Sequence, residues 1–180
     1  MSDDLTEKKI NSKLVYEGRL LRVFKDEVEL PDGERASREY IKHPGASVIV
    51  PIFSDGAVLI EYQFRYAIDS EVIELPAGKL DYGEEPIDTA RRELLEETGY
   101  SASHWEELGT LLPCIGYSNE RIHAFLARDL RFSGQKLDDG EFIKTDRVPL
   151  KTLVDWAHQG RISDAKSIIA LLWAKNILDK

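Results

Sequence analysis

The sequence predicts an α+β fold, a mixed α/β/α sandwich, with a small N-terminal β-sheet layer. A length of 180 residues suits one domain, or one domain with a small appendage. Hydrophobic residues make up 42% of the chain, which is enough to build a sizeable core. Strand-like runs along the chain are interrupted by few helical ones, and this mixture is typical of α+β and mixed α/β sandwiches.

The N-terminal part of the chain, residues 1–43, predicts a tail and a β-hairpin. The opening dozen residues are polar and predict a loose or partner-dependent tail. Two loosely alternating runs, 22–30 and 35–42, flank a Pro-Asp-Gly turn and predict the two strands of the hairpin. A His-Pro-Gly sequence then interrupts the pattern, so we expect the main domain to span residues 44–180.

The main domain begins with two apolar runs, 46–53 and 57–66, separated by a turn that contains Asp-Gly. This pattern predicts a second hairpin of buried strands. Four further runs predict strands: 71–78, 106–112, 121–127 and 141–148.

Three helices are expected. The first begins at Pro86, because proline is favoured at the first helical position, and ends near Thr98, where Gly99 supplies a C-terminal cap. The other two cover 150–158 and 165–179 near the C-terminus. Their tryptophans, at positions 156 and 173, lie among apolar neighbours and are expected in the core or in a dimer contact.

The charge of the chain excludes some classes of partner. There are 24 basic and 33 acidic residues, so the formal net charge is −9. Such a chain repels nucleic-acid backbones and anionic lipid, so no nucleic-acid or membrane partner is expected. An anionic substrate would need locally placed cations or a bound metal.

Cysteine content and the chain ends favour a cytoplasmic protein. Cys114 is the only cysteine, so neither an intrachain disulfide nor a zinc site built on several thiolates can form. The polar N-terminus is unlike a signal peptide. The apolar run 168–174 is far shorter than the roughly 20 residues of a membrane span. The four histidines show no metal-ligand spacing.

Three glutamates carry the strongest chemical signal. Glu93, Glu96 and Glu97 stand at positions i, i+3 and i+4 of the first predicted helix, so their carboxylates project from one face. Carboxylate oxygens in such a group suit Mg²⁺ or Mn²⁺. The alternative for an arbitrary run of this kind is a solvated, glutamate-rich helix face.

The segment 78–100, GKLDYGEEPIDTARRELLEETGY, resembles the signature of the Nudix hydrolases, G-x5-E-x7-R-E-U-x-E-E-x-G-U. Tyr100 departs from the pattern, which usually ends in an aliphatic residue, but this position concerns packing rather than chemistry. The matching residues are Gly78, Glu84, Arg92, Glu93, Leu94, Glu96, Glu97 and Gly99.

The resemblance implies an enzyme that cleaves a nucleoside diphosphate linked to a further group, with Mg²⁺, or alternatively Mn²⁺, as cofactor. It implies that Glu93 and Glu97 bind the metal directly and that Glu96 is a ligand, a partner of the ligands or a catalytic group. The main-chain carbonyl of Ala77 resembles the backbone ligand of the family. Two other signature residues are expected to be structural, Arg92 by orienting a glutamate and Glu84 by bracing the loop.

The chain looks most similar to the ADP-ribose pyrophosphatase subgroup, which carries a segment like QFRY…EVIELPAG before the signature. By this resemblance Arg65 holds a substrate phosphate, and Glu74 faces the terminal ribose or supports Arg65. The alternative for Arg65 is an exposed strand arginine. In this subgroup the N-terminal segment crosses to a partner subunit and completes the adenosine pocket, which predicts a homodimer. Candidates for adenine contacts are Arg38, Tyr40 and the pair Leu20–Leu21.

Two downstream stretches extend the resemblance. In LPCIGYSNERIHAF, Ile115 precedes Gly116, where the family usually has proline, and this departure leaves the substrate open. In LDDGEFI, residues 137–143, Glu141 resembles the general base of the subgroup, with Asp139 as the second choice. The alternative is an ordinary acidic turn.

The expected function is Mg²⁺-dependent hydrolysis of ADP-ribose to AMP and ribose 5-phosphate. A first alternative is a Nudix hydrolase of another nucleoside diphosphate sugar. A second is a Nudix-fold binding or regulatory module without turnover, although such a module would be expected to lack metal carboxylates, and all three are present. A third is an acidic interaction protein whose match to the signature is coincidental.

Overall fold

A computed structural model describes residues 4–137 and 139–180. The chain divides into two compact units. The N-terminal unit contains the chain up to Pro44 together with Cys114–Glu120, and the main unit contains Gly45–Pro113 and Arg121–Lys180. Each unit is described by itself.

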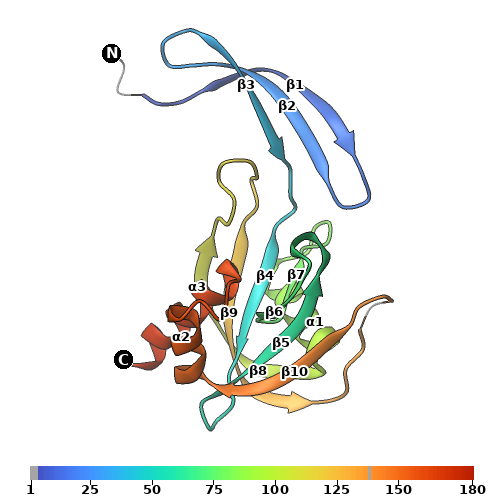
Figure 1. Cartoon of the computed structure of the whole chain (residues 1–180), viewed down its shortest axis with the longest axis vertical. Coiled ribbons are helices and arrows are strands. Elements are labelled where there is room, and N and C mark those ends of the chain that lie inside the picture. The colour runs from blue at the N-terminus through green and yellow to red at the C-terminus, as the bar shows by residue number, and fades with distance from the viewer. Residues whose placement is uncertain (1–3, 138) are drawn as a thin grey trace. The chain divides into compact units, whose positions relative to one another are not determined.

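The N-terminal unit is a three-stranded antiparallel sheet in the order β1-β2-β3 (Figure 1). Its strands are β1 (Lys8–Glu17), β2 (Arg22–Glu29) and β3 (Arg35–Ile41). The predicted hairpin corresponds to β2 and β3. The prediction of a loose tail was wrong, because residues from Lys8 onward form β1 along β2.

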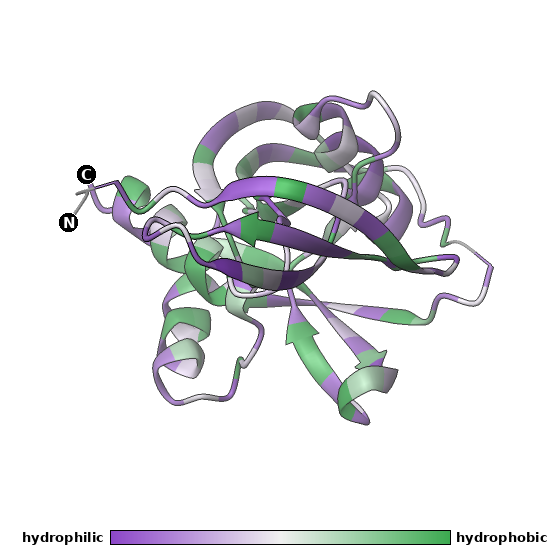
Figure 2. Ribbon diagram, turned by 90° about the horizontal axis from the view of Figure 1, so that it is seen from above, coloured by the Kyte–Doolittle hydropathy of each residue, from purple (hydrophilic) through white to green (hydrophobic). Residues whose placement is uncertain are grey.

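The missed strand has a physical explanation. Nearly every side chain of β1 is exposed, so its sequence lacks the alternation of apolar and polar residues that marks a half-buried strand. Hydrophilic residues dominate the strands of this sheet (Figure 2). The strand is held by its backbone ladder and by Ser12, whose Oγ donates a hydrogen bond to Oδ1 of Asp26 at 2.6 Å.

A segment distant in sequence also belongs to the N-terminal unit. Cys114–Glu120, the connection between two strands of the main unit, lies along the end of β3. The N–H of Ile41 donates to the carbonyl of Tyr117 at 2.8 Å, and the N–H of His43 donates to Oδ1 of Asn119 at 2.8 Å. The predicted boundary near residue 43 therefore separates only the first part of this unit from the main unit.

The main unit is built on two sheets, in the orders β7-β4-β9-β8 and β10-β5-β6 (Figure 1). In the first sheet β4 runs parallel to β9, and the other neighbours are antiparallel. A short 3₁₀ helix, Tyr66–Ile68, joins β5 to β6. The strands are β4 (Ala46–Pro51), β5 (Ala57–Arg65), β6 (Ser70–Glu74), β7 (Ala77–Lys79), β8 (Tyr100–Leu111), β9 (Ile122–Phe132) and β10 (Ile143–Pro149).

The predicted hairpin of runs 46–53 and 57–66 was wrong in its pairing. The turn between them forms, since the N–H of Phe53 donates to the carbonyl of Ala57 at 2.8 Å. Beyond one isolated bridge, however, β4 and β5 enter different sheets. Both runs are largely apolar, so neither carries a clear alternation that selects its neighbour. The run 71–78 likewise divides into β6 and β7, which belong to different sheets.

The helices agree closely with the prediction and cover α1 (Pro86–Thr98), α2 (Leu150–His158) and α3 (Ala165–Leu178). Gly99 caps α1 in a left-handed conformation with φ of 74°, and its N–H donates to the carbonyl of Leu95 at 2.9 Å. In the described residues, no helix is long and apolar enough to span a membrane.

The core shows why this is an α/β/α arrangement. Alternating residues of β4 point to opposite faces of the sheet. On one face Ile49 packs with Ala90 and Leu94 of α1. On the other face Val48 and Val50 belong to the cluster that contains β5, α2 and α3, and this cluster takes up the tryptophans of the C-terminal helices as partly buried residues. The fold class predicted from the sequence is confirmed.

Candidate active site

The packing of α1 determines where its glutamates lie. Ala90 and Leu94 are fully buried in the core. Glu97 is buried as well, whereas Glu93 is partly buried. The carboxylate of Glu93 lies against the backbone of Gly78 in β7, where an added Cβ would come within 1.8 Å of its Oε1. A glycine is therefore required at this point for the helix and the preceding loop to approach each other.

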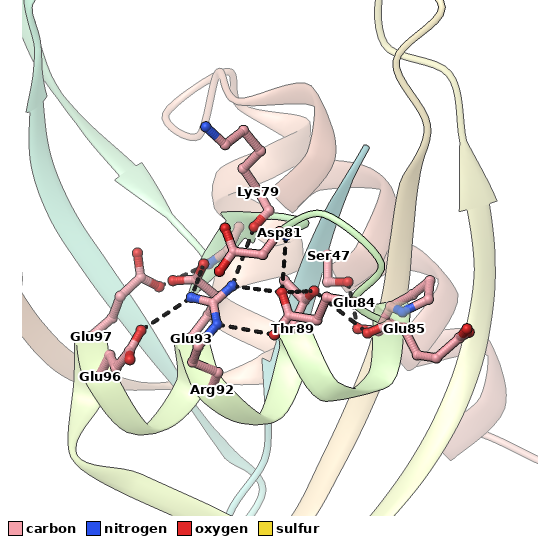
Figure 3. A network of polar contacts seen from close by, with 12 residues as sticks. Ser47, Lys79, Asp81, Glu84, Glu85, Thr89, Arg92, Glu93, Glu96 and Glu97 are labelled. Carbon is pink, nitrogen blue, oxygen red and sulfur yellow. Dashed lines mark hydrogen bonds and ion pairs between the residues drawn. The ribbon is translucent and has the colours of Figure 1, made fainter. Parts of the chain in front are cut away.

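Arg92 lies at the centre of a carboxylate network (Figure 3). It donates Nε to Oε1 of Glu84 at 3.1 Å and Nη2 to Oε2 of the same residue at 3.0 Å. Its Nη1 donates to Oε1 of Glu93 at 2.8 Å and to Oε2 of Glu96 at 3.1 Å. The guanidinium thus orients the glutamates on its own helix.

Glu84 fastens the loop before α1. Hydrogen bonds from Arg92 are the largest cause that lowers the pKa of Glu84 to about 2, so the residue carries its charge at neutral pH. Its Oε2 also accepts hydrogen bonds from the N–H of Asp81 at 3.1 Å and from Oγ1 of Thr89 at 2.7 Å. The hydrogen bonds of Arg92 and Glu84 agree with the structural roles that the resemblance implies for these two residues.

Glu97 faces the end of the loop that contains the proposed backbone ligand. Its Oε2 accepts a hydrogen bond from the N–H of Ala77 at 3.0 Å. Burial raises the pKa of Glu97 well above its ordinary value, and the neighbouring charges of Glu61 and Glu93 raise it further. Burial also raises the pKa of Glu93. These carboxylates lie in surroundings that disfavour uncompensated negative charge.

Glu61 was missed by the sequence analysis. It lies on β5 opposite Glu74 of β6, and only 3% of its surface is exposed. Among the described residues its Oε1 has no hydrogen-bond partner. Burial, followed by the charge of Glu74, raises the pKa of Glu61. The available signal was a single acid within the otherwise apolar run AVLIEYQF.

The carboxylates fit a divalent cation in their chemistry. The donor set consists of oxygens, which are the ligands that Mg²⁺ and Mn²⁺ prefer, and a cation would neutralise buried like charges. Within residues 4–137 and 139–180, however, no three acidic, histidine or cysteine side chains converge on one point as a ready-made metal site. Arg92 binds one oxygen of Glu93 and one oxygen of Glu96, which leaves the second oxygen of each carboxylate for a cation.

A second group of charged residues adjoins this cluster. Arg65 forms a bidentate ion pair with Glu74, with distances of 2.6 Å and 2.8 Å. Lys166, at the start of α3, contacts Glu74 as well and lies 3.0 Å from Oδ2 of Asp164. Burial acts to raise the pKa of Glu74, but the hydrogen bonds from Arg65 and the charge of Lys166 outweigh it, so the pKa is lowered.

These residues line a cavity of about 350 Å³. Glu74 supports Arg65 directly, which is one of the two roles that the resemblance offered for it. Lys166 was not anticipated, because its place beside Glu74 depends on packing between distant segments. The cavity is lined by Arg65, Ile68, Val72, Glu74, Ser163, Asp164, Ala165 and Lys166.

The two general-base candidates differ in their surroundings. Asp139 lies exposed in a turn, whereas Glu141 is partly buried. Burial is the largest cause that raises the pKa of Glu61, Glu93 and Glu97, and the charge of Glu141 adds to the rise in all three. Glu141 is therefore within electrostatic reach of the carboxylate cluster. Asp138 lies outside the described residues.

The proposed adenine contacts belong to the N-terminal unit. Arg38 pairs with Glu7, donating its Nε to Oε2 at 2.9 Å. The hydroxyl of Tyr40 lies 3.3 Å from Oδ2 of Asp26, and Leu20 is exposed. The role of Arg38 toward a substrate stays a prediction.

Comparison with known proteins decides the family. The family model described as the NUDIX domain matches residues 42–171, which include α1 and its glutamates. The chain belongs to the Nudix family. A second model, the nucleoside diphosphate sugar hydrolase N-terminal domain, matches residues 7–41 of this Nudix protein.

Proteins similar to this Nudix chain narrow the class of enzyme to which it is related. It is 36% identical over 169 residues to the ADP-ribose pyrophosphatase of Bacillus subtilis, covering 93% of this chain and 91% of the relative. It is 35% identical over 167 residues to the methanol dehydrogenase activator of Bacillus methanolicus, covering 92% and 90%. A crystal structure of an ADP compounds hydrolase matches with a TM-score of 0.87 and 25% identity, covering 99% of this chain and 97% of that one.

These similarities confirm the resemblance drawn from the signature. The chain is a Nudix pyrophosphohydrolase, similar to the ADP-ribose pyrophosphatases.

Proposed function

We propose that this Nudix enzyme uses Mg²⁺ to hydrolyse ADP-ribose to AMP and ribose 5-phosphate. The observation that carries the proposal is the group of like-charged carboxylates on α1, of which Glu97 is buried, adjacent to a cavity that contains Arg65 and Lys166. The ADP-ribose pyrophosphatase of Bacillus subtilis, similar over most of both chains, supports the choice of substrate.

The metal would be held by Glu93, Glu97 and the carbonyl of Ala77, with Glu96 as a ligand or a partner of the ligands. When bound, the cation would neutralise phosphate charge and lower the pKa of an attacking water. Mn²⁺ offers a similar preference for oxygen ligands. Arg92 would keep the glutamates positioned on one side of the helix, and Gly78 would leave room for the carboxylate of Glu93.

Substrate binding would depend on local cations, because the chain as a whole is acidic. The side chain of Arg65 is nearly half exposed, and its ion pair uses only two of the guanidinium nitrogens, so it has donors left for a phosphate oxygen. Glu74, which Lys166 also contacts, would hold Arg65 in place.

Glu141 is our choice of general base. A carboxylate near the cluster can accept a proton from water on its Oε atom at neutral pH. Asp139 is the alternative, but it lies exposed in the turn, whereas Glu141 is partly buried and acts electrostatically on Glu61, Glu93 and Glu97.

We also propose that residues 1–43 mediate a homodimer and contribute to the adenosine pocket. Among the described residues of the N-terminal unit only Asp26 and Val28 are buried, so this sheet has almost no core of its own. A sheet without a hydrophobic core is marginally stable in water and requires something to pack against. Within residues 4–43, the exposed large hydrophobic residues are Leu5, Ile10, Val15, Tyr16, Leu20 and Leu21.

A hydrolysis panel tests the substrate. Purified protein with Mg²⁺ should be incubated with ADP-ribose, ADP-glucose, GDP-mannose and NADH, and kcat/KM compared. We expect ADP-ribose to be the best substrate and AMP to be released with ribose 5-phosphate. A higher kcat/KM for another nucleoside diphosphate sugar would support the alternative substrate, which the N-terminal family match and Ile115 before Gly116 leave open. Absence of hydrolysis with all four would contradict the proposal.

A further inference from the structure

Glu61 is a buried acid that neither the Nudix signature nor the charged pair Arg65–Glu74 accounts for. It lies in the middle of β5 with 3% of its surface exposed. Its Oε1 is buried and has no hydrogen-bond partner in the part of the chain that the structure describes. Buried carboxylates are usually paired or hydrogen-bonded, because an unpaired one bears the full free-energy cost of its desolvation.

The nearby cations are already engaged by other acids. Arg65 uses two nitrogens in its bidentate pair with Glu74. Lys166 contacts both Glu74 and Asp164. Their charges lower the pKa of Glu61, but burial and the charge of Glu74 outweigh this effect. Among residues 4–137 and 139–180, one oxygen of Glu61 is therefore left without a donor.

The strand pairing brings Glu61 toward the glutamates of α1. Glu61 is opposite Glu74, and three residues after Glu74 the N–H of Ala77 binds Oε2 of Glu97. Glu97 is itself 6% exposed. Burial is the largest cause that raises the pKa of Glu97, and the charge of Glu61 comes next, before that of Glu93. Glu61 on β5 is thus within electrostatic reach of the buried Glu97 on α1.

We propose that Glu61 adds a carboxylate oxygen to the divalent cation held by Glu93 and Glu97, a ligand that the Nudix signature does not contain. This inference rests on the proposed metal dependence and extends it to a residue outside α1. A bound cation would supply the missing partner of Oε1 and neutralise the repulsion between Glu61 and Glu97. Without such a cation, an apolar or amide side chain would suit this buried position better than an acid.

Metal binding in the absence of substrate tests the inference. Mn²⁺ should be titrated into the full chain and the free ion followed by its electron paramagnetic resonance signal. We expect Glu61→Gln, which keeps the shape and removes the charge, to weaken Mn²⁺ affinity by roughly tenfold or more. Its melting temperature without metal should equal or exceed that of the wild type, because a buried charge is removed. Glu61→Asp should bind Mn²⁺ more tightly than Glu61→Gln does, because it retains a carboxylate.

Glu106→Gln is the matched control. Glu106 is a partly exposed strand glutamate on β8, where it pairs with Arg128 at 3.2 Å. Its neutralisation should leave Mn²⁺ affinity unchanged.

The outcomes separate the inference from the proposed function. If Glu61→Gln binds Mn²⁺ as tightly as the wild type, Glu61 is a structural residue and the inference is overturned, while the metal site on α1 stands. If the wild type binds no Mn²⁺, the proposed metal dependence is overturned and the inference with it. If Glu61→Gln does not fold, Glu61→Met, an apolar side chain of similar length, takes its place. An affinity for Mn²⁺ equal to that of the wild type in Glu61→Met would overturn the inference.

Discussion

In the main unit, several carboxylates share a small number of basic side chains. Arg92 is shared among Glu84, Glu93 and Glu96, whereas the carboxylate of Glu97 accepts a hydrogen bond only from a backbone N–H among the described contacts. Hydrogen bonds from Arg92 lower the pKa of Glu84, whereas burial, followed by the charge of Glu61, raises the pKa of Glu97. The least compensated acid on α1 is therefore the one with most to gain from a metal.

Replacing Glu97 with glutamine should cut turnover by about 10³-fold or more, because metal catalysis supplies much of the barrier reduction. The melting temperature without metal should not fall, since the change removes a buried charge and keeps the shape of the side chain. Steady-state hydrolysis of ADP-ribose at saturating Mg²⁺ measures the effect, and circular dichroism checks the fold. Turnover like that of the wild type would contradict the assignment of Glu97 as a ligand.

A separate prediction concerns the general base. Glu141→Gln should lower kcat by about 10²–10⁴-fold with little change in KM, as expected for the loss of a proton acceptor. Asp139→Asn serves as the control on the same turn and should stay close to the wild type. If Asp139→Asn shows the loss and Glu141→Gln does not, the two roles are reversed.

Residues of the site differed in how far the sequence could predict them. The glutamates of α1 follow from helical spacing, which is local, and the structure places Glu93 and Glu97 beside the loop of Ala77 as that spacing requires. Glu61 and Lys166 reach the same region only through sheet pairing and the docking of α3. No periodicity in one segment can report such a contact.

At the scale of elements, the ends of the helices could be predicted from the sequence, whereas the pairing of the strands could not. Helix α1 begins at Pro86 and is capped by Gly99, as predicted, because capping depends on residues within one turn. The strands of the main unit were found near their predicted positions, but β4 and β5 were assigned to one hairpin. Strand β1 was missed, because its partner supplies the backbone ladder and its own side chains remain exposed.

The contact between β7 and α1 gives a prediction at this scale. Gly78→Ala would place a methyl group within 1.8 Å of Oε1 of Glu93, so the carboxylate or the loop must move. We expect a loss of kcat of about 10²-fold, since a displacement of roughly 1 Å in a site can cost this much, with α1 still folded. Gly116→Ala meets no atom within 4 Å and should leave the melting temperature unchanged. Full activity in Gly78→Ala would show that the close approach is not needed.

At the scale of the whole chain, the two units are built on different principles. The main unit has two hydrophobic clusters on opposite faces of β4 and β9. The N-terminal unit relies on strand pairing, on surface ion pairs such as Arg38–Glu7, and on the connection that follows β8. A unit with two buried side chains among its described residues contributes little to its own stability, so we expect contacts with a second subunit to hold it.

Removal of residues 1–43 tests this expectation. The truncated chain should be monomeric and should show a higher KM for ADP-ribose, because the proposed adenosine contacts are lost. The network of Arg92 and the clusters around α1 lie within the main unit, so Mn²⁺ affinity should be retained. Light scattering at micromolar concentration measures the oligomeric state of both forms. Leu20→Lys in the full chain is a milder variant and should shift the equilibrium toward the monomer. Unlike the truncation, it keeps the contact between Cys114–Glu120 and β3. A monomeric full-length protein, combined with an unchanged KM in the truncated form, would rule out a role of this unit in assembly and substrate binding.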